Sequence, residues 1–258
     1  MKVGALRNFA ARALLRLGFR LPRKEPSTIL SFGIEGDEDA QQGRVAELFF
    51  GHQGRSVHKW VQYLEPYERH FAPFRTKPVR MLEIGIQSGG SLELWRRYFG
   101  PDAIIYGIDI DPSTARNVDA PNQVRIGSQA DPEFLLKVLD EMGGVDIVLD
   151  DGSHIGSHQL VSLNVLFPLL SDGGLYVLED LHTAYWREWH GGYRRPGTAI
   201  EILKSLLDDM HHHYHPVGDR SGFGSRIKGI HAYDSIAFIE KSEPPEIGHT
   251  IRPKQQAS

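Results

Sequence analysis

The chain contains no cysteine among its 258 residues. Without thiols it can form neither a disulfide framework nor a thiolate metal site, and a cysteine nucleophile is excluded. This absence fits a reducing compartment, so we expect a cytoplasmic protein. The chain also lacks any run of about 18 apolar residues, so no transmembrane helix is predicted. Its formal net charge of −4 at pH 7 argues against general nucleic-acid binding.

What is present suits a globular protein. Hydrophobic residues make up 40% of the chain, which is sufficient for a core. The length suits one α/β domain with extensions. The charge is unevenly spread, because residues 1–26 hold seven basic side chains and one acidic side chain. Subtracting this +6 from the net charge of −4 leaves −10 on the other 232 residues.

The basic arm, residues 1–26, is predicted to form an amphipathic helix over residues 3–21. Its leucines and alanines share one side, while Arg12, Arg16 and Arg20 lie on the other. Three interpretations stay open. The helix packs on the body or on a neighbouring subunit of a homo-oligomer, it makes peripheral contact with an anionic membrane, or it is a targeting peptide.

Residues 27–77 are expected to form a linker followed by a helical lid segment. The part from 27 to 45 is glycine-containing and acidic, as in a linker. The part from His58 to Phe71 is rich in aromatic residues at helical spacing. Such a helix either caps the body or forms a lid over an active site.

Alternating strands and helices are predicted within residues 78–242, and a flexible polar tail over residues 243–258. The expected strands are residues 79–84, 104–108, 124–126, 145–149, 175–178, 227–231 and 235–239. The expected helices are residues 92–98, 132–141, 157–170 and 199–210. This alternation predicts an α/β fold, a Rossmann-like, doubly wound, mostly parallel sheet with helices on both faces. Ligands bind beyond the carboxyl ends of the strands in such sheets.

A glycine loop follows the first expected strand. Gly85 and Gly89 let the backbone turn tightly, but their G-x-x-x-G spacing is not the dinucleotide fingerprint. The carboxylate of Glu83 before the loop disfavours a phosphate and suits a cationic or hydroxyl-rich ligand. The pattern E-x-G-x-x-x-G resembles motif I of the class I S-adenosylmethionine-dependent methyltransferases.

That resemblance implies a set of cofactor-binding residues. Asp109 ends the second strand, where a carboxylate can accept hydrogen bonds from both ribose hydroxyls. Ser128 and Gln129 follow the third strand, where the edge of the adenine is expected. The full predicted set for S-adenosyl-L-methionine is Glu83, Gly85, Gly89, Ser91, Asp109, Ser128, Gln129 and Asp150.

Acidic pairs follow two further strands, at Asp150–Asp151 and Glu179–Asp180. Adjacent strands would bring these carboxylates together, and a divalent cation would relieve their repulsion. Oxygen ligands favour Mg²⁺, or Mn²⁺, over zinc. His154, three residues after Asp151, is a candidate general base.

The motifs D-G-S-H at residues 151–154 and E-D-L-H at residues 179–182 resemble the metal-dependent sugar O-methyltransferases of macrolide biosynthesis, the mycinamicin and macrocin/demethylmacrocin enzymes. The resemblance implies methyl transfer to a sugar hydroxyl of a glycoside or of a glycan on a lipid. It makes Asp151, Glu179 and Asp180 the metal ligands and His154 the base. Because aromatic faces stack on sugar rings, we expect the acceptor pocket to be shaped by His182, Tyr185 and Trp186.

Relative to the mycinamicin type, we expect this chain to lack a large additional N-terminal domain and to carry the basic arm instead. Two other functions stay open at this point. One is a catechol-like or other small-molecule O-methyltransferase, which also uses a metal near acids at strand ends. The other is a cofactor-binding accessory subunit without chemistry, against which the presence of His154 and the acids argues.

Overall fold

A computed structural model describes residues 42–244 and 246–251. The basic arm, residues 27–41 of the predicted linker, and half of the predicted tail (residue 245 and residues 252–258) lie outside the described residues. Within the described part, no helix is long and apolar enough to cross a membrane.

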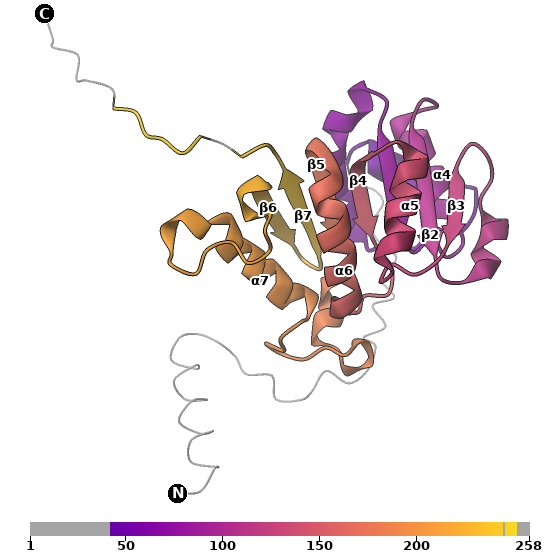
Figure 1. Cartoon of the computed structure of the whole chain (residues 1–258). Helices are drawn as coiled ribbons and strands as arrows, with labels where there is room; N and C mark the ends of the chain where they lie inside the picture. Colours follow the sequence, from indigo (N-terminus) through magenta and orange to yellow (C-terminus); the bar gives the residue numbers. More distant parts are fainter. Residues whose placement is uncertain (1–41, 245, 252–258) are drawn as a thin grey trace, which may run out of the picture. The chain divides into compact units, whose positions relative to one another are not determined.

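The centre of the fold is a seven-stranded sheet in the order β3-β2-β1-β4-β5-β7-β6 (Figure 1). The strands are β1 (Arg80–Ile84), β2 (Ile104–Asp109), β3 (Gln123–Ile126), β4 (Val145–Asp150), β5 (Leu170–Leu178), β6 (Ile227–Tyr233) and β7 (Ile236–Lys241). Strands β1 to β5 pair in parallel, whereas β7 runs antiparallel to both β5 and β6. The predicted mostly parallel sheet is confirmed.

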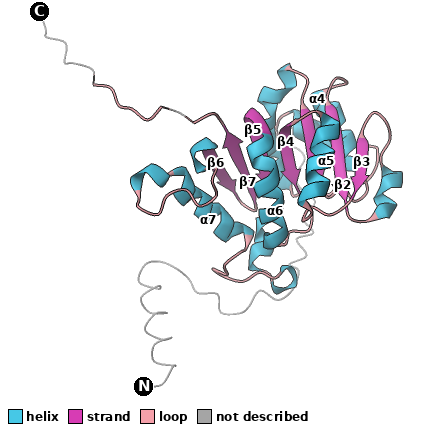
Figure 2. Cartoon of the chain, viewed as in Figure 1, coloured by secondary structure: helices cyan, strands magenta, loops and turns pink. Residues whose placement is uncertain are grey.

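Helices cover both faces of this sheet (Figure 2). They are α2 (Arg44–Phe50), α3 (Leu64–Phe71), α4 (Gly90–Phe99), α5 (Pro132–Met142), α6 (Gly156–Leu166) and α7 (Ala199–Met210). Helices α5, α6 and α7 pack on one face and α2, α3 and α4 on the other. Successive strand residues point to opposite faces, so in β4 Val148 joins the first layer while Ile147 and Leu149 join the second.

Local signals set the ends of several elements. Asp131 caps α5 by accepting hydrogen bonds from the backbone amides of Glu133, at 3.0 Å, and Phe134, at 3.2 Å. Pro132 occupies the first turn, where a missing amide hydrogen costs nothing, and Gly143 ends the helix in a left-handed conformation. The predicted start of this helix is confirmed.

The boundary between α6 and β5 was predicted wrongly. The helix expected to reach Leu170 ends at Leu166, and β5 begins at Leu170 rather than Leu175. Pro168 lies in a 3-10 turn between them, and proline cannot continue an α-helix. The early part of β5 contains two glycines and shifts register against β4, so no period-two pattern marks it.

Helix α3 belongs to no strand–helix unit of the body, yet it is deeply buried. Tyr67 and Phe71 are fully buried and pack against Trp95 of α4 and Phe238 of β7. Pro66 lies in the first turn of this helix, where it is tolerated. The segment just before α3 is thereby held across the carboxyl ends of the central strands.

Candidate active site

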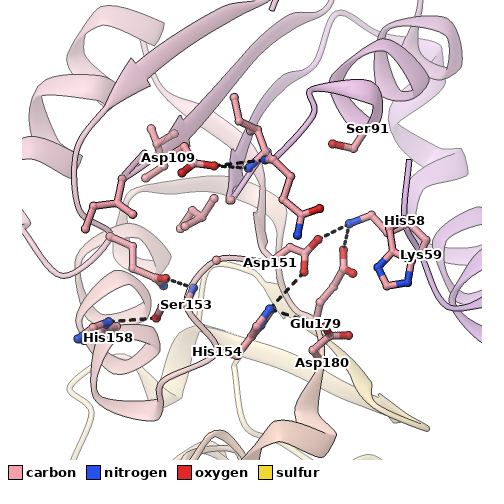
Figure 3. Close-up of a pocket in the computed structure, with 18 of the residues that line it drawn as sticks. His58, Lys59, Ser91, Asp109, Asp151, Ser153, His154, His158, Glu179 and Asp180 are labelled. Atoms are coloured by element: carbon pink, nitrogen blue, oxygen red, sulfur yellow. Dashed lines mark hydrogen bonds and ion pairs between the residues drawn. The ribbon is translucent and has the colours of Figure 1, made fainter. Parts of the chain in front are cut away.

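A cleft of about 330 Å³ opens at the carboxyl ends of β1, β2, β4 and β5 (Figure 3). This is the edge of the sheet where the topology reverses and ligands are expected. The walls come from the loops after these strands and β3, and from the segment before α3. The lining residues include Ser56, Val57, His58, Lys59, Trp60, Gly85, Ile86, Gln87, Ser91, Asp109, Ser128, Gln129, Asp151, Gly152, Ser153, His154, His158, Glu179 and Asp180.

The glycine loop is held in shape by Asp109. The Oδ2 atom of Asp109 accepts hydrogen bonds from the backbone amides of Ile86, at 3.1 Å, and Gln87, at 3.2 Å. Gly85 has a φ of +83°, and a side chain there would clash with the carbonyl oxygen of Asp151. Gly85 is therefore required for both the turn and the close approach of the β1 and β4 loops.

Gln129 links the cleft wall to a buried carboxylate. Its Nε2 atom donates to Asp150 Oδ1 at 3.0 Å, and its Oε1 atom accepts from the backbone amide of Ser153 at 2.7 Å. Asp150 is fully buried and also accepts hydrogen bonds from Ser162 and Tyr176. Asp150 thus fixes the orientation of Gln129 and does not line the cleft itself.

Two more of the predicted cofactor residues lie behind the cleft wall. Glu83 is fully buried and accepts a hydrogen bond from Ser91 Oγ at 2.9 Å. Burial raises the pKa of Glu83 to about 7, although the ammonium of Lys59 opposes this shift. Gly89, with a φ of +77°, forms the turn into α4 and leaves no room for a side chain beside Asn117.

His154 lies between two carboxylates on the floor of the cleft (Figure 3). Its Nε2 atom is 3.8 Å from Asp151 Oδ1 and 3.6 Å from Asp180 Oδ2. Both His154 and Asp180 adopt left-handed backbone conformations, with φ of 55° and 54°. Residues other than glycine rarely adopt this conformation, and such strain concentrates at functional sites.

Lys59 is one of the site residues that the sequence did not indicate. Its buried Nζ atom donates to Asp151 Oδ2 at 2.6 Å and to Glu179 Oε1 at 2.7 Å (Figure 3). Burial alone would lower the pKa of Lys59, but Asp151 and Glu179 outweigh burial and raise it, so the ammonium form is held. Nothing in the sequence singles out Lys59, because other charged residues, such as Glu65 and Arg69, share the same aromatic-rich segment.

Two tyrosines from the same region complete the network. Tyr63 donates from its hydroxyl to Asp180 Oδ1 at 2.8 Å, and Tyr67 donates to Glu179 Oε1. Burial raises the pKa of both phenols, so both remain hydrogen-bond donors at neutral pH. The acids after β4 and β5 are therefore positioned largely by side chains that precede or belong to α3.

The predicted acceptor residues lie beside the cleft. The ring of His182 contacts Trp60, which lines the cleft, with 5.2 Å between centroids. It also contacts Trp186, at 4.5 Å. Tyr185 is 44% exposed and points away from the core. The structure thus connects His182 and Trp186 to the cleft through Trp60 and leaves Tyr185 at the surface.

The donor set at the cleft floor fits a divalent cation. One ligand atom each from Asp151, His154 and Asp180 lies within 4.8 Å of the others. Carboxylate oxygens are the ligands that Mg²⁺ prefers. Of the three predicted ligands, Glu179 is not in this group, and Lys59 links it to the group by bonding both Glu179 and Asp151. The buried Nδ1 atom of His154 has no hydrogen-bond partner among the described residues.

Comparison with known proteins gives no matching family model but clear relatives. The chain is 39% identical over 220 residues to the 8-demethyl-8-(2-methoxy-alpha-L-rhamnosyl)-tetracenomycin-C 3'-O-methyltransferase of Streptomyces olivaceus, covering 80% of this chain and 56% of that protein. It is 42% identical over 200 residues to the mycinamicin VI 2''-O-methyltransferase of Micromonospora griseorubida, covering 70% and 48%. The chain spans about half the length of these curated relatives.

A solved structure resembles the fold. It is the MycE methyltransferase from the mycinamycin biosynthetic pathway in complex with Mg, SAH and mycinamycin VI. The TM-score is 0.66 at 36% sequence identity, over 75% of this chain and 53% of that chain. The sheet order and the helices on both faces are therefore those of the class I methyltransferase fold, as predicted from the sequence.

Proposed function

From its relationship to the sugar O-methyltransferases of antibiotic biosynthesis, we propose that this chain is a metal-dependent O-methyltransferase. It would move a methyl group from S-adenosylmethionine to a sugar hydroxyl of a glycosylated small molecule. The observation that carries the proposal is the position of His154, between Asp151 and Asp180 at the floor of a cleft bounded by the glycine loop.

The cofactor end of the cleft is proposed to lie between the loops after β1, β2 and β3. Asp109 presents a half-exposed carboxylate there while holding the glycine loop, so it can serve the ribose hydroxyls. Ser128 and Gln129 form the opposite wall. Three of the predicted cofactor residues would act indirectly, from behind the cleft wall. Glu83 would hold Ser91, Asp150 would hold Gln129, and Gly89 would form the turn into α4.

The metal end is proposed to consist of Asp151, Glu179 and Asp180. When bound, a divalent cation such as Mg²⁺ supplies a Lewis acid that lowers the pKa of a coordinated sugar hydroxyl and orients it. Lys59, Tyr63 and Tyr67 hold these three carboxylates in place by direct hydrogen bonds. The protein therefore presents preorganised oxygen ligands, which limits the reorganisation needed during the reaction.

His154 is proposed as the general base. Its Nε2 atom would accept the hydroxyl proton, and the carboxylates of Asp151 and Asp180 would stabilise the resulting imidazolium. Imidazole suits this role because histidine exchanges protons near neutral pH. The acceptor oxygen would then bond to the methyl carbon as the carbon–sulfur bond breaks, and the sulfur would leave as a neutral thioether.

The acceptor sugar is proposed to lie near Trp60, His182 and Trp186. Trp60 lines the cleft and contacts His182, which in turn contacts Trp186, and these rings can offer apolar faces to a sugar ring. Tyr185, at the surface beside them, would contact the part of the acceptor beyond the sugar. Replacing Trp60 or Trp186 with alanine should raise KM for the acceptor more than for the cofactor.

We also propose that the basic arm, which lies outside the described residues, docks onto a neighbouring subunit or an anionic membrane surface. Seven basic side chains opposite a row of leucines suit either surface. Deleting residues 1–26 tests this proposal by gel filtration and vesicle sedimentation. An unchanged oligomer size together with unchanged vesicle binding would leave the arm without either role.

The test of the proposed activity is methyl transfer from radiolabelled S-adenosylmethionine to a panel of glycosides and catechols, with and without Mg²⁺. We expect label in a glycoside, in the presence of metal only. Label in catechols alone would overturn the sugar acceptor. Tight cofactor binding without transfer to any member of a broad panel would favour an accessory subunit.

A further inference from the structure

A second group of possible metal ligands lies outside the cleft. It consists of His70 of α3, His231 of β6 and Glu240 of β7, and one ligand atom of each lies within 4.8 Å of the others. None of the three lines the cleft described above. His231 and Glu240 lie on the two strands of one hairpin, whereas His70 is more than 150 positions away in the sequence, so its place in the group results from the packing of α3 on β7.

The sheet register places two of the ligands on one face. His231 pairs with Phe238, and Glu240 follows two residues later on the same side of β7. The Nε2 atom of His231 is 3.1 Å from Glu240 Oε1. His70 of α3 packs on this face and stacks on the Phe238 ring, with centroids 4.3 Å apart and an interplanar angle of 20°. Its Nδ1 atom is 4.0 Å from the same oxygen of Glu240.

The other ring nitrogen of His70 is within hydrogen-bond distance of a tyrosine. Its Nε2 atom lies 2.9 Å from the hydroxyl of Tyr233. When Nε2–H donates to that hydroxyl, Nδ1 carries a lone pair that can bind an ion, 4.0 Å from Glu240 Oε1. A hydrogen bond of this kind to the distant ring nitrogen is how proteins orient metal-binding histidines.

The carboxylate retains an oxygen for an ion. Lys228 lies 3.2 Å from Glu240 Oε2, whereas Oε1 is directed at the two imidazoles. His231 is 41% exposed in its side chain, so the group is open to solvent and leaves room for water or a further ligand. Two imidazole nitrogens and one carboxylate oxygen with an open position form a typical zinc donor set.

We propose that His70, His231 and Glu240 bind a zinc-class divalent cation at the outer end of the sheet. The ion would link α3, through His70, to the β6–β7 hairpin, through His231 and Glu240. Because Tyr67 lies on the same helix and bonds Glu179, the ion would also stiffen the support of the cleft. This chemistry differs from that of the cleft floor, where carboxylate oxygens dominate and Mg²⁺ is favoured.

The test is isothermal titration of the full chain with ZnCl2 in a buffer containing saturating Mg²⁺, which occupies oxygen-rich sites. We expect one tight zinc equivalent in the wild type and at least about a tenfold loss of affinity in H231N and E240Q. H213N is the matched control, because His213 is exposed and lies outside the group. It should leave the tight binding unchanged.

Two further measurements keep the proposal falsifiable. Y233F leaves all three ligands in place and should weaken zinc binding about tenfold by freeing the His70 ring. Zinc should raise the thermal unfolding midpoint of the wild type but not of H231N. Wild-type affinity in both H231N and E240Q, or no tight zinc binding by the wild type, would overturn the proposal. Neither result depends on methyl transfer, so the test stands apart from the proposed activity.

Discussion

The ammonium group of Lys59 contacts two of the three carboxylates proposed to bind the metal. It is surrounded by Asp151 and Glu179 at hydrogen-bond distance and by Glu83 at 3.7 Å. A buried charge is stabilised only when it is paired, and removing one partner leaves the others uncompensated. We therefore expect Lys59 to stabilise the folded acid-rich pocket when no cation is bound.

Replacing Lys59 tests this role. K59M should lower the free energy of unfolding by about 3–5 kcal/mol in metal-free buffer. Mg²⁺ should restore part of that loss, because binding to the folded state stabilises it by mass action. Urea unfolding with and without Mg²⁺ measures both effects. K137M, at an exposed position of α5, is the control, and equal stability of the two variants would contradict the role of Lys59.

His154 is the second residue with a sharp prediction. H154A should lower kcat by about 10²–10⁴, the usual contribution of a general base. Cofactor affinity, measured by calorimetry, should change little because His154 lies at the metal end of the cleft. H213A removes an exposed histidine from the same chain and should leave the rate unchanged. Near-wild-type turnover by H154A would exclude it as the base.

At the scale of elements, β1 and β4 are joined at their amino ends by one buried carboxylate. Asp146 of β4 accepts hydrogen bonds from the backbone amide of Arg80 at 2.8 Å and from its Nε atom at 3.2 Å. Burial alone would raise the pKa of Asp146, but the bonds from Arg80 outweigh it and the pKa lies below its usual value. This link holds together the two strands whose carboxyl ends carry the glycine loop and Asp151.

The pH dependence of D146N follows from that lowered pKa. A depressed carboxyl pKa contributes stability that is complete above the unfolded value, about 3.9, and is lost as the pH falls through the folded value. D146N should therefore lose about 1–3 kcal/mol at pH 7. The gap to the wild type should narrow below about pH 4. D140N, an exposed change on α5, should show no such gap when both are unfolded in urea across this range.

Helix α3 links several parts of the molecule. It places Tyr67 on Glu179, while His70 reaches Tyr233 and lies near Glu240. The helix precedes the first strand in the chain but packs on β7, the last strand. Its burial anchors the segment that carries Lys59 and Trp60 into the cleft. A movement of α3 would therefore displace side chains at both proposed metal sites.

At the scale of the whole molecule, the two proposed sites predict separate metal responses. EDTA should abolish methyl transfer, and Mg²⁺ alone should restore it. H231N should show the same Mg²⁺ dependence as the wild type, because His231 does not line the cleft. Activity is measured with labelled cofactor after dialysis against each metal. Full activity in EDTA would contradict metal-dependent transfer.

Much of this architecture was predictable from the sequence. Local apolar periodicity predicts the strand positions and their alternation with helices. Once the strands are located, the acidic residues are seen to follow their carboxyl ends. The motifs at residues 151–154 and 179–182 were assigned to one site because parallel strands end at one edge. The start of β5 was missed because its glycines and its register shift hide the strand pattern.

The order of the elements and the edge at which the acids gather were determined by the sequence alone, since both depend on patterns within a few residues. The position of Lys59 was decided only by the tertiary structure, because its bond to Asp151 joins residues 92 positions apart. The same is true of Tyr67 with Glu179 and of the group formed by His70, His231 and Glu240. Such contacts depend on where α3 packs, and helix packing is set by the shape and burial of whole surfaces rather than by spacing along the chain.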